Sequence, residues 1–353
     1  MKKSLLALAV LGAFVGAASA QSSVTIYGSL DLAITKGNGG TAANNNANGT
    51  SKAWIEKQSN ASRLGFRGNE DLGGGLSAQF QIEHRFTPDD GAAATNAPFW
   101  QGRSYVQLSS ATMGRVYLGR EYAPAFWIQV KSDPFGNDGI GQYGTIFSWA
   151  GFAVPSTVVA NSATTSNSRT SNTVGYKSPS FGGLTVNAAV GLGEGVVPRD
   201  SGFNVEYAAG PIYAGFAYEK LSGLSAALGD GNSLINMAFH YDLGVVKPII
   251  YYARAKVAGG TLVNKTLQLG ALAPVGPGTL KAGYGRETLE AVAPASLGNI
   301  TKFSIGYDYP LSKRTNVYAD ASFGRQKDNV SSTGVRTSFT NNNAYAFGLK
   351  HTF

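Results

Sequence analysis

Cysteine is absent from the 353-residue sequence, charged residues make up only 14% of it, and no long apolar run follows residue 20. Without cysteine no disulfide can form, so stability must come from hydrogen bonding and packing. Low charge argues against a helix-rich cytoplasmic enzyme, and the lack of a run of about 18 apolar residues argues against membrane-spanning helices. The sequence is instead rich in glycine, with 46 residues, and in aromatic residues, with 17 Tyr and 18 Phe.

The first 20 residues have the pattern of a secretory signal peptide. Two lysines at positions 2 and 3 precede an apolar run over residues 5–18, and the small residues Ala-Ser-Ala follow at 18–20. The apolar run is too short for a membrane span. We therefore expect cleavage after Ala20 and a single mature domain over residues 21–353.

Basic side chains outnumber acidic ones. Without the two N-terminal lysines, 27 basic residues stand against 21 acidic ones. Nucleic-acid binding would call for a basic cluster with interleaved aromatic residues, and the sequence shows none, so we expect no nucleic-acid partner. A dispersed basic surplus on water-facing positions would instead bias a pore toward anions.

The clearest pattern lies between Ala61 and Phe86, where polar and apolar residues alternate in two arms around the junction DLGGG. Alternation gives each strand one polar and one apolar face, and the glycines suit a tight turn. The polar face carries Arg63 and Glu83. Such a face suits a wall that lines water, while the opposite face lies in an apolar medium.

The same alternation continues to the end of the chain and gives about sixteen strands. Tight turns alternate with longer polar loops, an asymmetry that is typical of outer-membrane barrels. Tyrosines near strand ends, such as Tyr307 and Tyr309, suit the level of the lipid headgroups. We predict an all-β fold, a transmembrane antiparallel β-barrel of 16 strands in the cell outer membrane, closed by pairing of the first strand with the last.

Two further segments stand out. Residues Tyr122 to Thr170 form the longest stretch without a strand period, and connections of this length are usually functional or disordered. The C-terminal strand carries alternating apolar residues that resemble the outer-membrane assembly signal, from which His351 departs: Tyr345, Phe347, Leu349 and Phe353.

Several motifs in one order carry a family resemblance. They are SVTIYGSLD (23–31), SRLGFRGNEDLGGGLSAQFQIE (62–83), GRVYLGRE (114–121), NTVGYKSPSFGGL (172–184) and the final Phe353. Together they resemble the Gram-negative general diffusion porins of the neisserial and betaproteobacterial branch. The resemblance implies a homotrimer in which the third external loop, here residues 122–170, folds into the lumen and narrows it. The expected partners are outer-membrane lipid, lipopolysaccharide, periplasmic chaperones, the barrel assembly machinery and small hydrophilic or anionic solutes.

The height of three charged residues follows from the strands themselves. Arg63, Glu83 and Arg103 each lie eight residues from a tight turn, and their parity points to the lumen. With a rise of about 3.3 Å per residue and a tilt near 45°, each lies roughly 18 Å above the periplasmic turns. We predict that they form a belt of charge at pore depth.

The resemblance extends this belt. By motif position, Arg169 joins Arg63 and Arg103 as a wall arginine, and the expected opposing carboxylates on the infolded loop are Asp133 and Asp138. The alternative is that these arginines only satisfy neighbouring strand carbonyls and carboxylates.

Other functions find less support. The three histidines lie in no catalytic motif, and HExxH, GxSxG and phosphate-binding loops are missing, so we expect neither catalysis nor a cofactor. A channel selective for anionic solutes and a surface adhesin remain alternatives. The sequence predicts a water-filled general porin with a weak preference for anions, which passes small hydrophilic solutes and ions.

Overall fold

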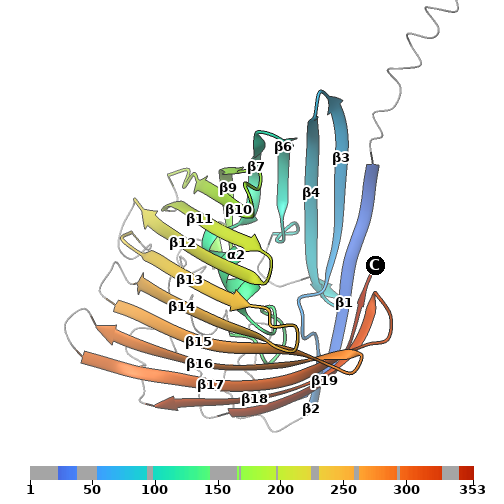
Figure 1. Cartoon of the computed structure of the whole chain (residues 1–353), viewed down its shortest axis with the longest axis vertical. Helices are drawn as coiled ribbons and strands as arrows, with labels where there is room; N and C mark the ends of the chain where they lie inside the picture. Colours follow the sequence, from blue (N-terminus) through green and yellow to red (C-terminus); the bar gives the residue numbers. More distant parts are fainter. Residues whose placement is uncertain are drawn as a thin grey trace, which may run out of the picture.

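The computed structural model is a single ring of antiparallel strands (Figure 1). The structure describes residues 23–37, 54–93, 98–143, 165–166, 168–195, 198–223, 230–257, 262–291, 295–327 and 342–353. Residues 1–22, which include the expected signal peptide, and residues 144–164 of the expected constriction loop lie outside this part. No helix within the described ranges is long and apolar enough to cross a membrane.

Sixteen long strands make up the ring in the described part of the chain. The first six are β1 (Ser23–Lys36), β3 (Arg63–Gly73), β4 (Leu76–Thr87), β6 (Ser104–Ser110), β7 (Gly114–Tyr122) and β9 (Arg169–Lys177). The next five are β10 (Leu184–Gly191), β11 (Arg199–Ala209), β12 (Ile212–Ser222), β13 (Ser233–Tyr241) and β14 (Lys247–Val257). The last five are β15 (Leu262–Val275), β16 (Gly278–Ala291), β17 (Ala295–Pro310), β18 (Thr315–Lys327) and β19 (Asn342–Thr352). Three short strands, β2 (Trp54–Lys57), β5 (Ala92–Ala93) and β8 (Thr165–Ser166), pair at the margins.

The ring closes between its first and last strands. β1 pairs antiparallel with β19 from Ser29 opposite Thr352 to Lys36 opposite Tyr345. The backbone of Gly28 continues this seam, donating to the carbonyl of Phe353 (3.0 Å) and accepting from its amide (3.1 Å). The predicted closed barrel of sixteen strands, with the first strand beside the last, is confirmed.

Apolar side chains point out of the ring and polar side chains point in. On β13, Met237 and Phe239 are exposed on the outer face, while Asn236 and His240 are buried on the inner face. The same alternation repeats around the ring, as the sequence period requires. An exposed apolar outer surface of this extent suits a lipid environment.

The tight turn between β3 and β4 is built from three glycines with positive φ, Gly73, Gly74 and Gly75 (81°, 60° and 79°). Only glycine adopts this backbone readily. The ladder of the two strands continues as far as Gly73 opposite Leu76. The turn is therefore shorter than the sequence indicated.

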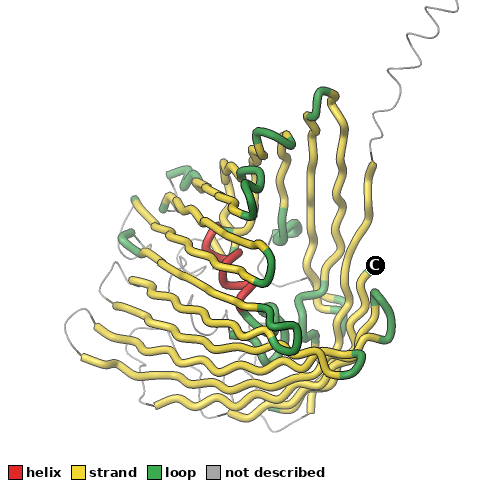
Figure 2. Tube along the Cα trace, viewed as in Figure 1, coloured by secondary structure: helices red, strands yellow, loops and turns green. Residues whose placement is uncertain are grey.

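One segment leaves the wall and runs inside the ring. After β7 the chain forms helix α2 (Pro124–Ser132), which Figure 2 shows enclosed by strands. The amide of Ala125 in the first turn donates to the Glu219 carboxylate on β12 (2.8 Å), so the wall supplies the acceptor that the helix N-terminus lacks. Ser132 at the other end contacts the inner wall through its hydroxyl, 3.0 Å from His240.

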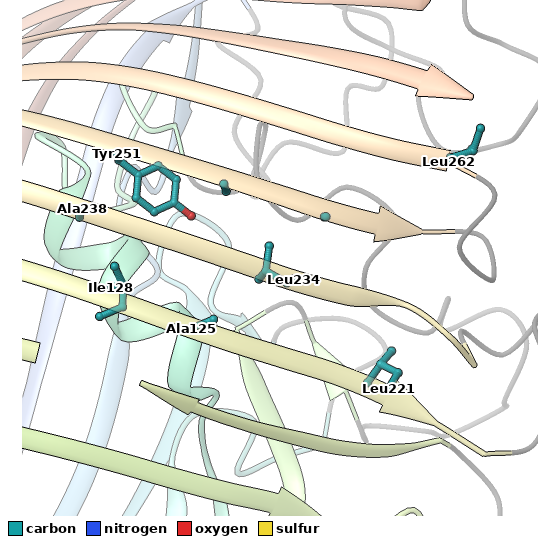
Figure 3. Close-up of a cluster of buried hydrophobic side chains, with 10 residues drawn as sticks. Ala125, Ile128, Leu221, Leu234, Ala238, Tyr251 and Leu262 are labelled. Carbon is teal, nitrogen blue, oxygen red and sulfur yellow. The ribbon is translucent and has the colours of Figure 1, made fainter. Parts of the chain in front are cut away.

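A small apolar cluster joins the helix to the wall. Ala125 and Ile128 pack with Ala217, Leu234 and other buried residues of β12 to β15 (Figure 3). Glycine on the wall makes room for this contact, since a Cβ at Gly215 would lie 2.7 Å from the Ile128 side chain. Helix α2 is thus held against one side of the barrel interior.

Candidate pore constriction

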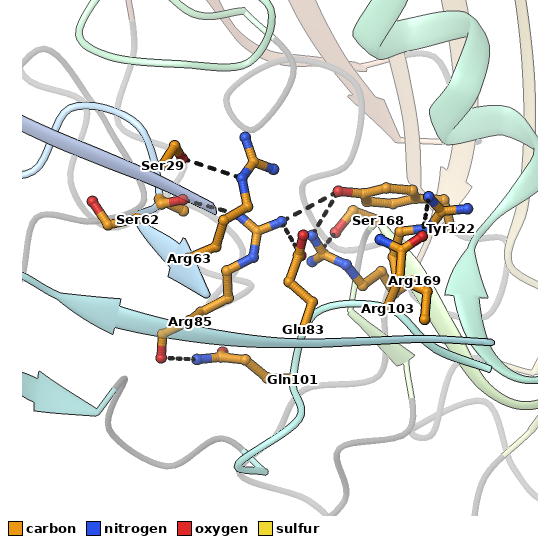
Figure 4. Close-up of polar contacts among 12 residues, drawn as sticks. Ser29, Ser62, Arg63, Glu83, Arg85, Gln101, Arg103, Tyr122, Ser168 and Arg169 are labelled. Carbon is orange, nitrogen blue, oxygen red and sulfur yellow. Dashed lines mark hydrogen bonds and ion pairs between the residues drawn. The ribbon is translucent and has the colours of Figure 1, made fainter. Parts of the chain in front are cut away.

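Arginines on the inner wall beside α2 gather around one tyrosine (Figure 4). Arg169 donates to the Tyr122 hydroxyl (2.9 Å), and Arg85 approaches the same oxygen (3.4 Å). The Arg169 guanidinium also lies over the Tyr122 ring, 4.5 Å from its centroid. Arg63 lies beside them on β3 and donates to Ser29 (3.2 Å). We call Arg63, Arg85, Arg103 and Arg169 the arginine cluster.

The neighbouring strands explain this convergence. Arg63 on β3 is the direct cross-strand partner of Arg85 on β4, so both reach the interior at the same height. Glu83 lies opposite Gly65, two residues along the ladder from Arg63. The sequence predicted Arg63 and Glu83 at the same height. In the structure they differ by two residues along the ladder, because the turn is centred one residue later than the sequence indicated.

Glu83 is almost fully buried, with 3% of its surface exposed. Its carboxylate pairs with the Arg85 guanidinium at 2.7 Å and accepts a hydrogen bond from the Tyr27 hydroxyl at 3.2 Å. Glu83 therefore neutralises and orients Arg85, and it presents little free negative charge to the lumen.

Arg103 is held by a fork of acceptors. Its Nε donates to the Glu121 carboxylate (2.7 Å), and its Nη2 pairs with the same carboxylate. Its Nη1 donates to the Gln81 side-chain oxygen (3.0 Å). The guanidinium lies over the ring of Tyr105 at 5.0 Å. A two-point arginine–carboxylate contact fixes both position and orientation. Arg103 is therefore a rigid part of the wall.

The two loop carboxylates lie in different surroundings. Asp133 is buried and accepts hydrogen bonds from the backbone amides of Phe135 (2.9 Å) and Tyr143 (2.7 Å), so it ties the infolded segment to itself. Asp138 follows α2 and pairs with Lys350 of β19 at 3.3 Å. The structure thus leaves the Asp138 side chain partly exposed beside Lys350 and buries Asp133 within the segment.

The protonation of Asp138 depends on its position inside the barrel. Loss of hydration raises the pKa of its carboxyl above the ordinary value, while Lys350 and Arg63 act in the opposite direction with less effect. Beside it lies a polar cavity of 360 Å³, lined by Asp31, Asp320 and Lys281 among others. This part of the wall mixes both signs of charge, in contrast to the arginine cluster.

Sequence reasoning did not select four residues that shape this site: Arg85, Glu121, Tyr122 and Trp127. The inward parity of Arg85, two residues after Glu83, was a signal that could have found it. Tyr122 and Trp127 belong to the infolded segment, where no strand period indicates orientation. Their rings lie 5.0 Å apart between centroids and line the space next to Arg103.

A closed barrel with an apolar outside and a charged, partly filled interior is an outer-membrane channel. A family model described as Gram-negative porin matches residues 7–329. The chain belongs to this family of outer-membrane porins, through which small solutes diffuse.

The similarity to known porins extends along nearly the whole chain. Outer membrane porin protein 32 of Delftia acidovorans is 34% identical over 340 residues, covering 93% of this chain and 91% of that protein. An outer membrane porin of Bordetella pertussis is 30% identical over 382 residues, covering 92% and 94%. The solved anion-selective porin from Comamonas acidovorans superposes with a TM-score of 0.76 at 28% identity, covering 94% of this chain and 100% of that one. The family and these relatives are channels.

Proposed function

We propose that this porin has a weak preference for anions and that the arginine cluster forms its constriction with Glu83 and Asp138. The observation that carries the proposal is the convergence of Arg63, Arg85 and Arg169 near the Tyr122 hydroxyl, with Arg103 adjacent. The solved relative from Comamonas acidovorans, described as anion-selective, supports the sign.

The charge balance of the cluster gives the physical reason. Four guanidinium groups stand against two contacting carboxylates, Glu83 and Glu121, so the described wall has a surplus of positive charge at this height. In a wet pore these charges are screened over about 10 Å at moderate salt. They therefore bias passage toward anions without excluding cations.

Asp133 supports the proposed constriction from within the infolded segment and does not line it. Its carboxylate is used by the loop backbone, so its contribution is to hold the shape of the infolded segment. Asp138, facing Lys350, is the loop carboxylate that passing ions would meet. The two aspartates thus contribute shape and charge respectively.

We extend the proposal to the export and assembly of the channel. We propose that residues 1–20 are removed, that residues 21–353 form one barrel domain with residues 122–170 as its constriction loop, and that three copies assemble. The exposed outer-face residues of β19, Tyr345, Phe347 and Leu349, together with Phe353, would serve the assembly machinery and its chaperones. Lipopolysaccharide would surround the external rim. No catalytic activity is proposed.

Liposome swelling tests the proposed function. Vesicles containing the purified porin should swell in small sugars at rates that fall with sugar size, and faster in gluconate than in glucosamine. Faster entry of glucosamine would contradict the anion preference. Absence of swelling in every solute would contradict an open diffusion pore. Saturation of the rate by one anionic solute class would favour the selective-channel alternative.

A further inference from the structure

We propose that Trp127, with Lys131 and Lys177, forms a subsite for aromatic carboxylates next to the arginine cluster. The inference rests on the proposed anion-preferring pore and names a solute class that this pore would retain. It is carried by an indole that faces the lumen and by the cations around it.

Trp127 and Lys131 lie on the free side of α2. The other side of the helix is buried against the barrel wall, through residues that include Ala125 and Ile128. Trp127 is partly exposed, and the Lys131 side chain, four residues later and hence one turn away, is 41% exposed. Both side chains therefore stand at the boundary between the infolded segment and the open lumen.

Three cations surround the indole of Trp127. The guanidinium of Arg103 lies 5.6 Å from the ring centroid, and the ammonium groups of Lys131 and Lys177 lie 5.8 and 5.3 Å away. These distances are within the range of cation–π attraction. The ammonium groups of both lysines thus lie beside an aromatic surface.

The three cations differ in what else they bind. Arg103 is held by Glu121 and Gln81, and Lys131 pairs with Glu206. Lys177, by contrast, has no ion pair with any residue of the described ranges. It is therefore the cation at this site with donors left for an incoming carboxylate.

The local charge favours an anion. Lys177 pairs across strands with Arg115, an exposed residue on β7, so two cations stand side by side near the tight turns. Together with Lys131 and Arg103, these two cations outnumber the two nearby carboxylates, Glu206 and Glu121. A carboxylate between Lys131 and Lys177 would accept charge-assisted hydrogen bonds while its ring meets the indole edge or face.

The subsite differs from the arginine cluster in its aromatic surface. In the cluster, the Tyr122 ring is covered by Arg169 and stacked on Phe126, with ring centroids 4.8 Å apart. The Trp127 indole meets Tyr122 edge-on. A small aliphatic anion can use the charges at both places, whereas an aromatic carboxylate gains an additional ring contact only at Trp127.

Ion-current recordings in planar bilayers provide the test, with benzoate compared against cyclohexanecarboxylate, which matches it in charge and approximate size. In the wild type, the half-blocking concentration should be about three- to tenfold lower for benzoate, as expected for one aromatic pair. Trp127→Leu should abolish this difference. Trp127→Phe should retain part of it, and Lys177→Gln should weaken block by both carboxylates.

Trp54→Leu is the matched control, because Trp54 also carries a cation–π contact, with Lys36, but lies at the barrel margin on β2. Equal block by the two carboxylates in the wild type would overturn the subsite even if Trp127→Leu failed to fold. A benzoate difference that survives Trp127→Leu would also overturn it. Absence of a chloride preference in the wild type would contradict the proposed function instead. Failure of the subsite and failure of the proposed function are therefore distinguishable.

Discussion

The Lys302 ammonium group on β17 donates hydrogen bonds of 2.7 Å to the backbone carbonyls of Ile140 and Gln142. Lys302 is 1% exposed, so this contact is shielded from water. The segment that follows α2 is therefore attached to the wall at Ile140 and Gln142 as well as through the helix.

Replacing Lys302 with methionine should loosen the segment. The substitution removes two hydrogen bonds with a charged donor, each worth on the order of 1.5–3 kcal/mol. Single-channel recordings should show increased open-channel noise, while the barrel should remain resistant to heat in gel assays because its strand ladders are intact. Lys313→Met, in an exposed turn, is the control. Open-channel noise at the wild-type level in Lys302→Met would contradict the proposed attachment.

Reversing the charge of Arg103 should move selectivity toward cations. Arg103→Glu leaves Glu121 without its partner and adds a second negative charge. A unit charge acting over several ångströms of water is worth on the order of 0.5–1 kcal/mol, so the anion-to-cation permeability ratio should fall about two- to fivefold. Arg67→Glu makes the same change nearer the turn and should have a smaller effect. Equal effects of the two variants would remove Arg103 from the constriction.

Lowering the pH should strengthen the anion preference through Asp138. Because the pKa of this carboxyl is raised, it takes up its proton at a higher pH than an ordinary aspartate and then no longer offsets Lys350. The permeability ratio for chloride over potassium should increase from pH 7 to pH 4. This increase should be reduced in Asp138→Asn and retained in Asp242→Asn, a turn variant. An unchanged pH response in Asp138→Asn would contradict the prediction.

Closing the barrel should depend on Gly28. A Cβ at this position would lie 2.4 Å from both the Arg63 carbonyl oxygen and the Phe353 ring. Gly28→Leu should therefore block the seam and reduce the heat-modifiable, folded form in outer-membrane fractions several-fold, because the Arg63 carbonyl belongs to the backbone of the paired strand and cannot shift without disrupting the strand pairing. Phe239→Leu, on the lipid face of β13, should assemble normally. If Gly28→Leu gave as much folded form as the wild type, the seam would tolerate a wider spacing between β1 and its neighbours, and the prediction would be wrong.

Strand periodicity predicted the fold well because it reports directly which face of a strand meets water. It placed Phe239 outward and His240 inward, and closure followed from the need to pair every backbone group. The site was harder to predict. A positive φ at Asn172 and a register shift opposite it, between Gly119 and Glu121, interrupt the alternation just after Arg169.

The infolded segment could not be predicted in detail for a related reason. Asp133 and Asp138 share the short sequence SDPFGNDG, and each is a plausible pore carboxylate from composition alone. Their different surroundings arise from backbone turns and from distant wall residues such as Lys350. No local period encodes such contacts, so the sequence could not separate the surroundings of the two carboxylates.

The zero-current potential of the wild-type porin in a KCl gradient tests the anion preference most directly. Because the arginine cluster carries more positive than negative charge, the potential should have the sign of chloride preference, and it should move toward zero in the combined variant Arg63→Gln, Arg103→Gln, Arg169→Gln. A wild-type potential with the sign of potassium preference would contradict the cluster as the element that sets selectivity.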